Sequence, residues 1–289
     1  MSLEEKFTLF YNIALIQILL VILLIFVSIE LFKWINHLLL LRELKNIPFP
    51  KYYEKVLKKI PYYNLLDDDL KLKLHYKMMI FIEEKEWLGI KHDITFEMKV
   101  IVSFYACLIV VNMNEKSYSN LNTIYIYPYE YIIDEIKSYD GLYTKQKFII
   151  EGQSSGGVVV LSWHNIKKEI YNFKNHNVII HEFAHELDFE DGFADGVPVL
   201  ENSKYKSWAI DMFKTYKTLN EKSLTNRFWG KYKLFGNNGA INEAEFFAVA
   251  SELFFQKPNS LQQKFPKVYK QLLQFYKIDT VKLFTKKGI

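Results

Sequence analysis

The segment His-Glu-Phe-Ala-His at positions 181–185 has the residue types and the spacing for metal chemistry. Two histidines separated in this way lie on the same face of an α-helix, one turn from each other. A single Zn²⁺ can then bind both imidazoles at about 2.0–2.1 Å. Glu182 directly follows His181, where its carboxylate can act as a general base toward water at the metal. We therefore predict that His181 and His185 are zinc ligands and that Glu182 is catalytic.

The same segment also fits an amphipathic helix whose two histidines are ordinary core or surface residues. Histidine is scarce, with 7 in the chain, and the motif arises by chance in roughly 1 of 100 such chains. The motif is expected on a helix over residues 177–188, which ends before Asp191-Gly192. His164 and His176 lie near it in sequence and are interpreted as loop or surface histidines rather than ligands.

A catalytic zinc site usually has three protein ligands and one open position, so a third ligand must come from elsewhere. The segment 242–255 has apolar residues at helical spacing, and Asn242 can cap its start. Glu245 lies among the apolar residues of this helix, where a buried carboxylate needs a partner such as a metal. Glu243 lies in the first turn, where the helix dipole already favours an acidic residue. Glu245 is therefore the candidate third ligand.

Two further carboxylates could orient a ligand histidine. Asp188 follows His185 on the same helix, and it either holds a histidine in place or simply ends the helix. Glu252 comes two turns after Glu245 and lies on a similar face of its helix. It is either a supporting residue of the metal centre or a solvated side chain.

The elements that must position these residues form one large α+β domain, with a small sheet and helices packed on it. Helical spacing predicts helices at residues 67–85, 95–112, 203–222, 242–255 and 259–275. A strand is predicted at residues 123–128, and a hairpin at 148–163 that turns between Gly152 and Gly157. The connections between these segments are polar and are expected to be loops.

The apolar stretch just before the motif helix is a candidate substrate strand. It consists of Val158, Val159, Val160 and Leu161. In zinc peptidases an edge strand near the active site often pairs with an extended substrate. An ordinary interior strand would have the same sequence.

The N-terminal stretch from Phe7 to Ile29 contains no charged side chain. As a helix it spans about 34 Å, enough to cross a hydrocarbon core of about 30 Å. A cleaved signal peptide fits less well, because Glu4-Glu5-Lys6 is not basic and no small-x-small cleavage site follows. A buried core helix is the third interpretation. We divide the chain into a tail (1–6), a transmembrane helix (7–29), a basic amphipathic linker (30–60) and the main domain (61–289).

Basic residues predict how this helix is oriented. Lys33, Arg42, Lys45 and Lys51 follow the span, and only Lys6 precedes it. The positive-inside rule then predicts a single-pass protein of the cell inner membrane whose main domain faces the cytoplasm. The single cysteine, Cys107, agrees with a reducing compartment. The formal net charge of +4 is small for the length and gives no reason to expect a nucleic-acid partner.

The chain resembles the Mlc titration factor A family of zinc-dependent peptidases, which is related to the catalytic domain of anthrax lethal factor. The resemblance rests on His-Glu-Phe-Ala-His-Glu-Leu-Asp (181–188), the glycine-containing segments that follow at 191–198, and Glu-Phe-Phe-Ala-Val-Ala-Ser-Glu (245–252). Upstream, the segments 124–128 and 157–163 are similar to strands of the family. The resemblance implies a zincin-like, gluzincin-like domain with one Zn²⁺ per chain. Its ligands would be His181, His185 and Glu245, with Glu182 as the base.

Two positions depart from the family pattern. Family members usually carry a tyrosine shortly before the helix of the third ligand, where it helps to stabilise the oxyanion. Asn238 occupies that position here, and Tyr232 is the nearest upstream tyrosine. A tryptophan typical of the hairpin is also replaced, because Gly152 is followed by Gln-Ser-Ser. Losing one oxyanion donor typically lowers the rate by on the order of 10²–10³, although asparagine can itself donate a hydrogen bond.

Two functions from different classes follow. The first is a membrane-anchored zinc metallopeptidase that hydrolyses a peptide or protein substrate and is held in the bilayer by residues 7–29. The second is a membrane-tethered binding protein that sequesters a transcriptional regulator with little or no catalysis, because the resemblance includes a member that sequesters a repressor of sugar uptake. The presence of Glu182 favours the enzyme, since a purely structural metal site needs no base.

Overall fold

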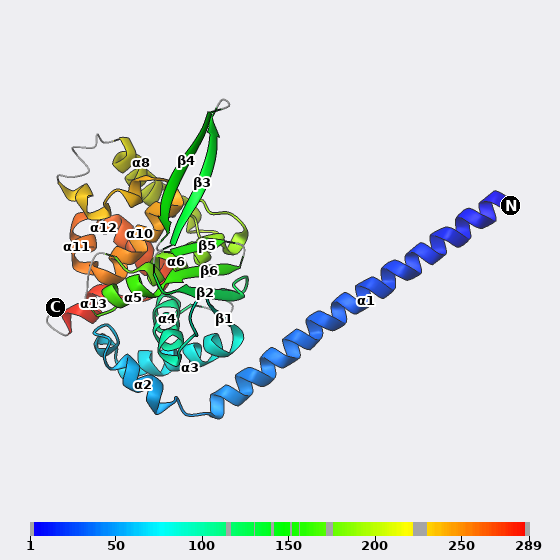
Figure 1. Cartoon of the computed structure of the whole chain (residues 1–289), viewed down its shortest axis with the longest axis horizontal. Helices are drawn as coiled ribbons and strands as arrows, with labels where there is room; N and C mark the ends of the chain where they lie inside the picture. The colour runs from blue at the N-terminus through cyan, green and yellow to red at the C-terminus, as the bar shows by residue number, and fades with distance from the viewer. Residues whose placement is uncertain are drawn as a thin grey trace. The chain divides into compact units, whose positions relative to one another are not determined.

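The chain folds into two compact units, Met1–Pro48 and Phe49–Ile289 (Figure 1). The computed structural model describes residues 3–113, 117–129, 131–139, 142–150, 152–155, 157–171, 176–221 and 230–286. The two units are described separately below. The first is a single helix, and the second contains the sheet and the core.

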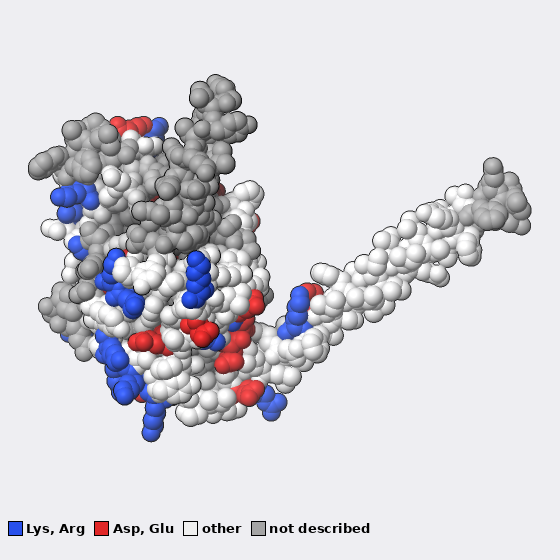
Figure 2. Space-filling model, viewed as in Figure 1, with Lys and Arg blue, Asp and Glu red and all other residues white. Residues whose placement is uncertain are grey.

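In the described residues of the first unit, helix α1 (Leu3–Asn46) is the single element. The segment Phe10–Asn46 is long and apolar enough to cross a membrane, by length and composition. The helix continues past Ile29, because the next residue that cannot continue a helix is Pro48. In the space-filling view, the part of the helix that is not drawn in grey is white over most of its length, and charged side chains are seen toward its C-terminal end (Figure 2).

The second unit is mainly helical. Its α-helices are α2 (Lys51–Leu57), α3 (Asp68–Glu84), α4 (Phe96–Ile109), α5 (Trp163–Glu169), α6 (Val178–Asp188), α7 (Tyr205–Trp208), α8 (Lys214–Glu221), α10 (Glu243–Gln256), α11 (Pro258–Lys264), α12 (Pro266–Tyr276) and α13 (Thr280–Thr285). Short 3₁₀ turns occur at η1 (Tyr63–Leu65), η2 (Phe189–Asp191), η4 (Lys231–Phe235) and η5 (Asn238–Ala240), and η3 (Ala209–Phe213) is a π-helical segment.

A four-stranded sheet has the order β1-β2-β6-β5. Its strands are β1 (Glu86–Gly89), β2 (Thr123–Tyr127), β5 (Gly152–Ser155) and β6 (Val158–Ser162). Strands β1, β2 and β6 are parallel, whereas β5 runs antiparallel to β6. Strand β6 is therefore an interior strand, with β2 on one side and β5 on the other. The expectation that Val158–Leu161 forms an edge strand is wrong, because both of its neighbours take its backbone hydrogen bonds.

A separate antiparallel pair consists of β3 (Tyr131–Tyr139) and β4 (Leu142–Ile150). This segment was expected to be a polar loop, and Phe148, expected in the hairpin with β6, belongs to β4. That hairpin is the shorter pair of β5 and β6. An Asp-Gly dipeptide at positions 140–141 is a strong hairpin signal in the sequence.

The expected helices at 67–85, 95–112, 177–188 and 242–255 are confirmed by α3, α4, α6 and α10. The expected helix at 259–275 is two helices, because Pro266 has no N–H to continue α11 and instead opens α12. Helix α4 is buried from Val100 to Ile109, with Thr95 as its N-cap. Helix α6 packs against α4, α10 and β5, so the motif helix lies in the middle of the unit (Figure 1).

Candidate metal centre

The motif helix α6 begins at a side-chain cap. The side chain of Asn177 accepts a hydrogen bond from the backbone N–H of Ile180 at 3.1 Å. The first turn is buried, as its apolar sequence predicts. Gly192, at φ 94°, follows η2 in the left-handed region that favours glycine. The local sequence therefore fixes both ends of the helix that presents His181 and His185.

Three side chains converge in the manner of a metal site. The ligand atoms of His181, His185 and Glu245 all lie within 4.8 Å of one another. The two Nε2 atoms are 3.2 Å apart, and Glu245 lies 3.3 Å from His181 Nε2 and 3.4 Å from His185 Nε2. Ligands at tetrahedral angles around Zn²⁺, each at about 2.0–2.1 Å, are separated by about 3.4 Å. The donor set therefore fits one zinc ion in both chemistry and spacing.

Helix α10 positions Glu245 through its own cap. The side chain of Asn242 accepts a hydrogen bond from the backbone N–H of Glu245 at 2.8 Å. The helix packs against α6, so the carboxylate in its first turn reaches the two imidazoles. Partial burial opposes ionisation of Glu245, but the hydrogen bonds with His181 and His185 outweigh it and lower the pKa of the carboxyl.

A second carboxylate, Glu252, holds the side of His181 that faces away from the other two ligands. Its Oε1 lies 2.6 Å from His181 Nδ1. Its Oε2 lies 2.6 Å from His176 Nδ1 and accepts the backbone N–H of Asn177 at 2.7 Å. Burial alone would raise the pKa of Glu252, but the two histidine hydrogen bonds lower it overall. An ionised carboxylate only accepts, so His181 donates from Nδ1 and keeps Nε2 available to a metal.

Glu182 lies beside the three ligands but is not one of the converging group. Its side chain is buried, with 5% of the residue exposed. Burial raises the pKa of Glu182 to about 7, with Glu245 and Glu252 acting in the same direction and His181 opposing them. A carboxyl whose pKa is near neutrality can both take up and release a proton at that pH.

Asp188 bonds to backbone rather than to a histidine. Its Oδ2 accepts the N–H of Gly196 at 2.9 Å, and its buried Oδ1 has no hydrogen-bond partner in the part of the chain that the structure describes. Gly196 has φ 77°, and a Cβ there would lie 2.5 Å from the carbonyl oxygen of Glu243. Asp188 thus fixes the loop that closely approaches the start of α10.

This geometry makes Asp188 a source of pH-dependent stability. Burial raises its pKa from 3.8 to about 6, so the folded protein binds its proton more tightly than the unfolded chain does. Stability is therefore lost as pH rises from about 4 to about 6, by on the order of 3 kcal/mol. We expect Asp188→Asn to abolish this dependence and to be more stable than the parent at pH 8, measured by urea unfolding. If the difference in free energy of unfolding between the parent and the variant is the same at pH 4 and at pH 8, this prediction is contradicted.

The two candidates for the oxyanion contact lie on the turns before α10. Asn238 is exposed at the start of η5, which packs against α10. Tyr232 is half-buried in η4, with its ring centroid 5.2 Å from that of Phe265. The role of either residue stays a prediction.

The two other histidines near the motif differ from each other. His164 lies beside Tyr129, with ring centroids 5.7 Å apart. His176 shares the Glu252 carboxylate with His181, a role that its interpretation as a loop or surface residue did not include. Its position directly before the cap residue Asn177 is the only sequence signal for this role.

A histidine pair on a buried helix, joined by a glutamate from a later helix, is the donor set of metallopeptidases with this motif. The chain belongs to the glucose-regulated metallo-peptidase M90 family, whose model matches residues 36–277. It is 29% identical over 242 residues to an uncharacterized protein of Synechocystis sp., covering 81% of this chain and 86% of that protein. It is 29% identical over 233 residues to Mlc titration factor A of Escherichia coli O17:K52:H18, covering 76% and 83%. The resemblance stated above is confirmed.

Proposed function

We propose that this protein is a zinc-dependent peptidase with a zincin-like domain, anchored in a membrane by α1. The observation that supports this most strongly is the convergence of His181, His185 and Glu245 at separations suited to one zinc ion. Membership of a metallo-peptidase family supports the same chemistry. Glu182, buried beside these ligands, is the proposed general base.

In the proposed reaction, Glu182 and Glu252 have different roles. A zinc ion supplies Lewis-acid polarisation of the scissile carbonyl and a lower pKa for water. Glu182 accepts the proton of the attacking water and passes it to the leaving amine. Its buried carboxyl, with a pKa of about 7, is suited to both transfers. Glu252 holds His181 through Nδ1 and so keeps Nε2 directed at the metal.

Substrate binding by strand addition is proposed for β5 instead of β6. Strand β5 pairs with β6 on one side, and no strand pairs with its other side in the described part of the chain. Helix α6 packs against β5, so a peptide added to that edge would lie beside the metal centre. An open strand edge offers unpaired backbone groups to an extended chain.

Membrane anchoring is proposed from α1. An isolated apolar helix, alone in its unit, has no neighbour in that unit to cover it. A bilayer would cover its apolar side chains. The helix can span one because its backbone hydrogen bonds are internal. The basic residues that follow the apolar stretch favour a cytoplasmic second unit. Protease protection in sealed inner-membrane vesicles would test this: digestion of the second unit in right-side-out vesicles would contradict it.

The direct test of the function is metal dependence. We expect the full-length protein in lipid nanodiscs to hold about one zinc per chain and to hydrolyse peptides, because the three ligands complete a catalytic donor set. Removing the metal with a chelator should abolish hydrolysis, and adding zinc back should restore it. Metal content by mass spectrometry and cleavage of a fluorogenic peptide library would measure both. A protein that holds no zinc would show that the assignment of the ligands is wrong.

The oxyanion contact can be assigned with two variants. We expect either Tyr232→Phe or Asn238→Ala to lower kcat by about 10²–10³ with zinc retained, because only one of the two side chains supplies the donor. The other variant serves as the control and should remain close to the parent. If both keep full activity, the donor is a different group.

A regulatory binding function is the second candidate. Its support is the name of the Escherichia coli relatives, Mlc titration factor A, which describes them as factors that titrate Mlc. In this proposal the second unit sequesters a transcriptional regulator at the membrane. A Glu182→Gln variant that still captures the regulator would favour it, and loss of capture together with loss of hydrolysis would favour the enzyme.

A further inference from the structure

The carboxylate of Glu252 connects a second histidine to the metal centre. Its Oε1 lies 2.6 Å from Nδ1 of the ligand His181, and its Oε2 lies 2.6 Å from Nδ1 of His176. The side chain of Glu252 is 2% exposed, whereas that of His176 is 37% exposed. His176 is therefore the outer residue of a series of contacts that runs through a buried carboxylate to a zinc ligand.

Two donors hold one oxygen of this carboxylate. Oε2 accepts from Nδ1 of His176 and, at 2.7 Å, from the backbone N–H of Asn177. The terminal torsion of a glutamate has no sharply preferred angle, so neighbouring groups must set the plane of its carboxylate. Two donors on the same oxygen restrict that plane more than the backbone N–H does alone. The other oxygen, Oε1, is then held toward Nδ1 of His181.

This contact also joins the two helices that carry the ligands. Glu252 lies on α10, two turns after Glu245, and His176 directly precedes Asn177, the N-cap of α6. The separation of 3.3 Å between Glu245 and Nε2 of His181 depends on how α6 and α10 pack together. A hydrogen bond between the start of α6 and the middle of α10 therefore bears on the spacing of the ligands as well as on the orientation of His181.

The start of α6 is capped by a different residue. The side chain of Asn177 accepts the backbone N–H of Ile180, which is the usual work of an N-cap. The ring of His176 directs its Nδ1 at the carboxylate of Glu252 instead. An ionised carboxylate only accepts, so Nδ1 of His176 carries a proton and donates it to this hydrogen bond. This donation acts on Glu252 and, through Glu252, on His181.

We propose that His176 is a positioning residue of the metal centre. It is not one of the three converging ligands, and it acts on the metal by holding Glu252 against Nδ1 of His181. His181 thereby keeps Nε2 directed at the metal. The inference rests on the zinc site of the proposed function, and it extends the support of that site to a residue outside α6 and α10.

The test is the zinc affinity of the full-length protein in lipid nanodiscs, measured by competition with a zinc indicator. His176→Leu is expected to weaken zinc binding by about tenfold, at the lower end of the effect of outer partners, because it acts one residue further out than Glu252. His176→Asn is expected to stay within about twofold of the parent, because its amide nitrogen lies as many bonds from the backbone as Nδ1 of histidine and can also donate. Equal weakening in His176→Asn and His176→Leu would overturn the proposal.

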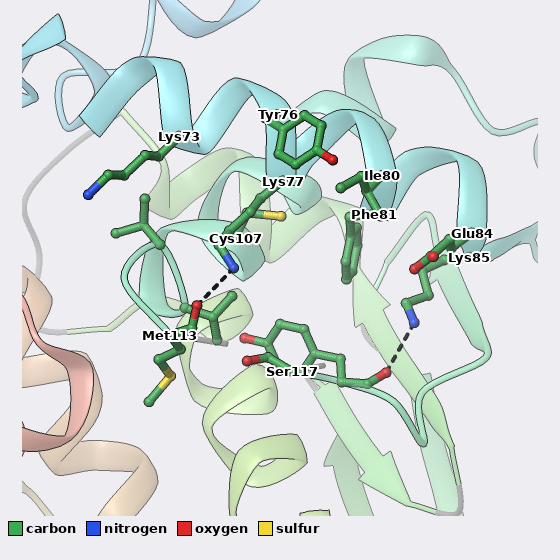
Figure 3. Close-up of a pocket in the computed structure, with 13 residues that line it drawn as sticks. Lys73, Tyr76, Lys77, Ile80, Phe81, Glu84, Lys85, Cys107, Met113 and Ser117 are labelled. Carbon is green, nitrogen blue, oxygen red and sulfur yellow. Dashed lines mark hydrogen bonds between the residues drawn. The ribbon is translucent and has the colours of Figure 1, made fainter. Parts of the chain in front are cut away.

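Two control variants lie outside this contact. His164→Leu removes the other histidine near the motif, whose ring lies beside that of Tyr129. Ile80→Ala shortens a side chain in the wall of a cavity beside α3, where it lies next to Phe81 (Figure 3). It is expected to lower the stability of the fold through lost packing and to leave the zinc affinity unchanged. Weakening of zinc binding in either control as large as in His176→Leu would overturn the proposal, because the effect would then be a general one.

Thermal unfolding of the metal-free proteins checks that each variant is folded. If His176→Leu does not fold, His176→Ser replaces it with the same expectation, since serine is polar but too short to reach Glu252. A parent that binds zinc no more tightly than the folded variant would refute this inference alone. A parent that binds no zinc would refute the proposed function and this inference together.

Discussion

Replacing Glu182 by glutamine is expected to lower peptide hydrolysis by about 10²–10⁴-fold while zinc remains bound. The substitution keeps the size of the side chain and removes its capacity to accept a proton. The three converging ligands are untouched, and Glu182 is not one of them. Burial of the uncharged amide is easier than burial of a carboxylate, so the fold should be at least as stable.

The measurement that checks this is kcat together with zinc content on the same preparation. Glu186→Gln is a matched control, because Glu186 is another buried glutamate of α6 and lies outside the group that could hold a metal. We expect this control to hydrolyse peptides at a rate close to that of the parent. Full activity in Glu182→Gln with one zinc bound would remove Glu182 from the mechanism. Loss of zinc in Glu182→Gln would mean that the carboxylate supports the metal instead.

The parts of the site that sequence predicts well are those set by local rules. The spacing within 181–185 places both histidines on one face, and Asn177 and Asn242 cap the helices as their positions predict. Glu245 could be singled out because a carboxylate within an apolar helix needs a partner. Each of these inferences uses residues less than two turns apart.

The parts that sequence leaves open depend on contacts between distant segments. Whether Val158–Leu161 is an edge or an interior strand depends on whether β5 pairs beside it, and the sequence of β6 is the same in both cases. The sequence left open whether Asp188 and Glu252 orient a histidine, and the packing of α10 on α6 places Glu252, and not Asp188, against His181. The role of His176 depends on the same packing.

Two differences between the predicted and the observed secondary structure involve signals that are present in the local sequence. The Asp-Gly dipeptide between β3 and β4 is a hairpin signal, yet the polar residues around it favoured a loop. Pro266 separates α11 from α12, although the apolar spacing continues across it. In both cases a strong backbone preference mattered more than the hydrophobic pattern.

The largest effect on stability is expected at Glu252. Its carboxylate accepts three hydrogen bonds, two from imidazoles and one from the backbone of Asn177, and it is almost fully buried. Replacing it by alanine removes the shared acceptor of three donors, two of them buried, and opens a cavity between α6 and α10. We expect Glu252→Ala to lower the free energy of unfolding by about 3–5 kcal/mol, measured by urea unfolding at pH 7.

Glu252→Gln separates this structural effect from an effect on the metal. A glutamine can still accept from one imidazole, so the fold should be largely kept, but it no longer offers a carboxylate to His181 Nδ1. Removing such an outer partner typically weakens metal binding by about 10–100-fold. Competition with a zinc indicator should show this loss in Glu252→Gln, whereas Glu243→Gln, on the same helix, should bind zinc as the parent does. Equal zinc affinity in Glu252→Gln and the parent would mean that Glu252 only holds α6 and α10 together.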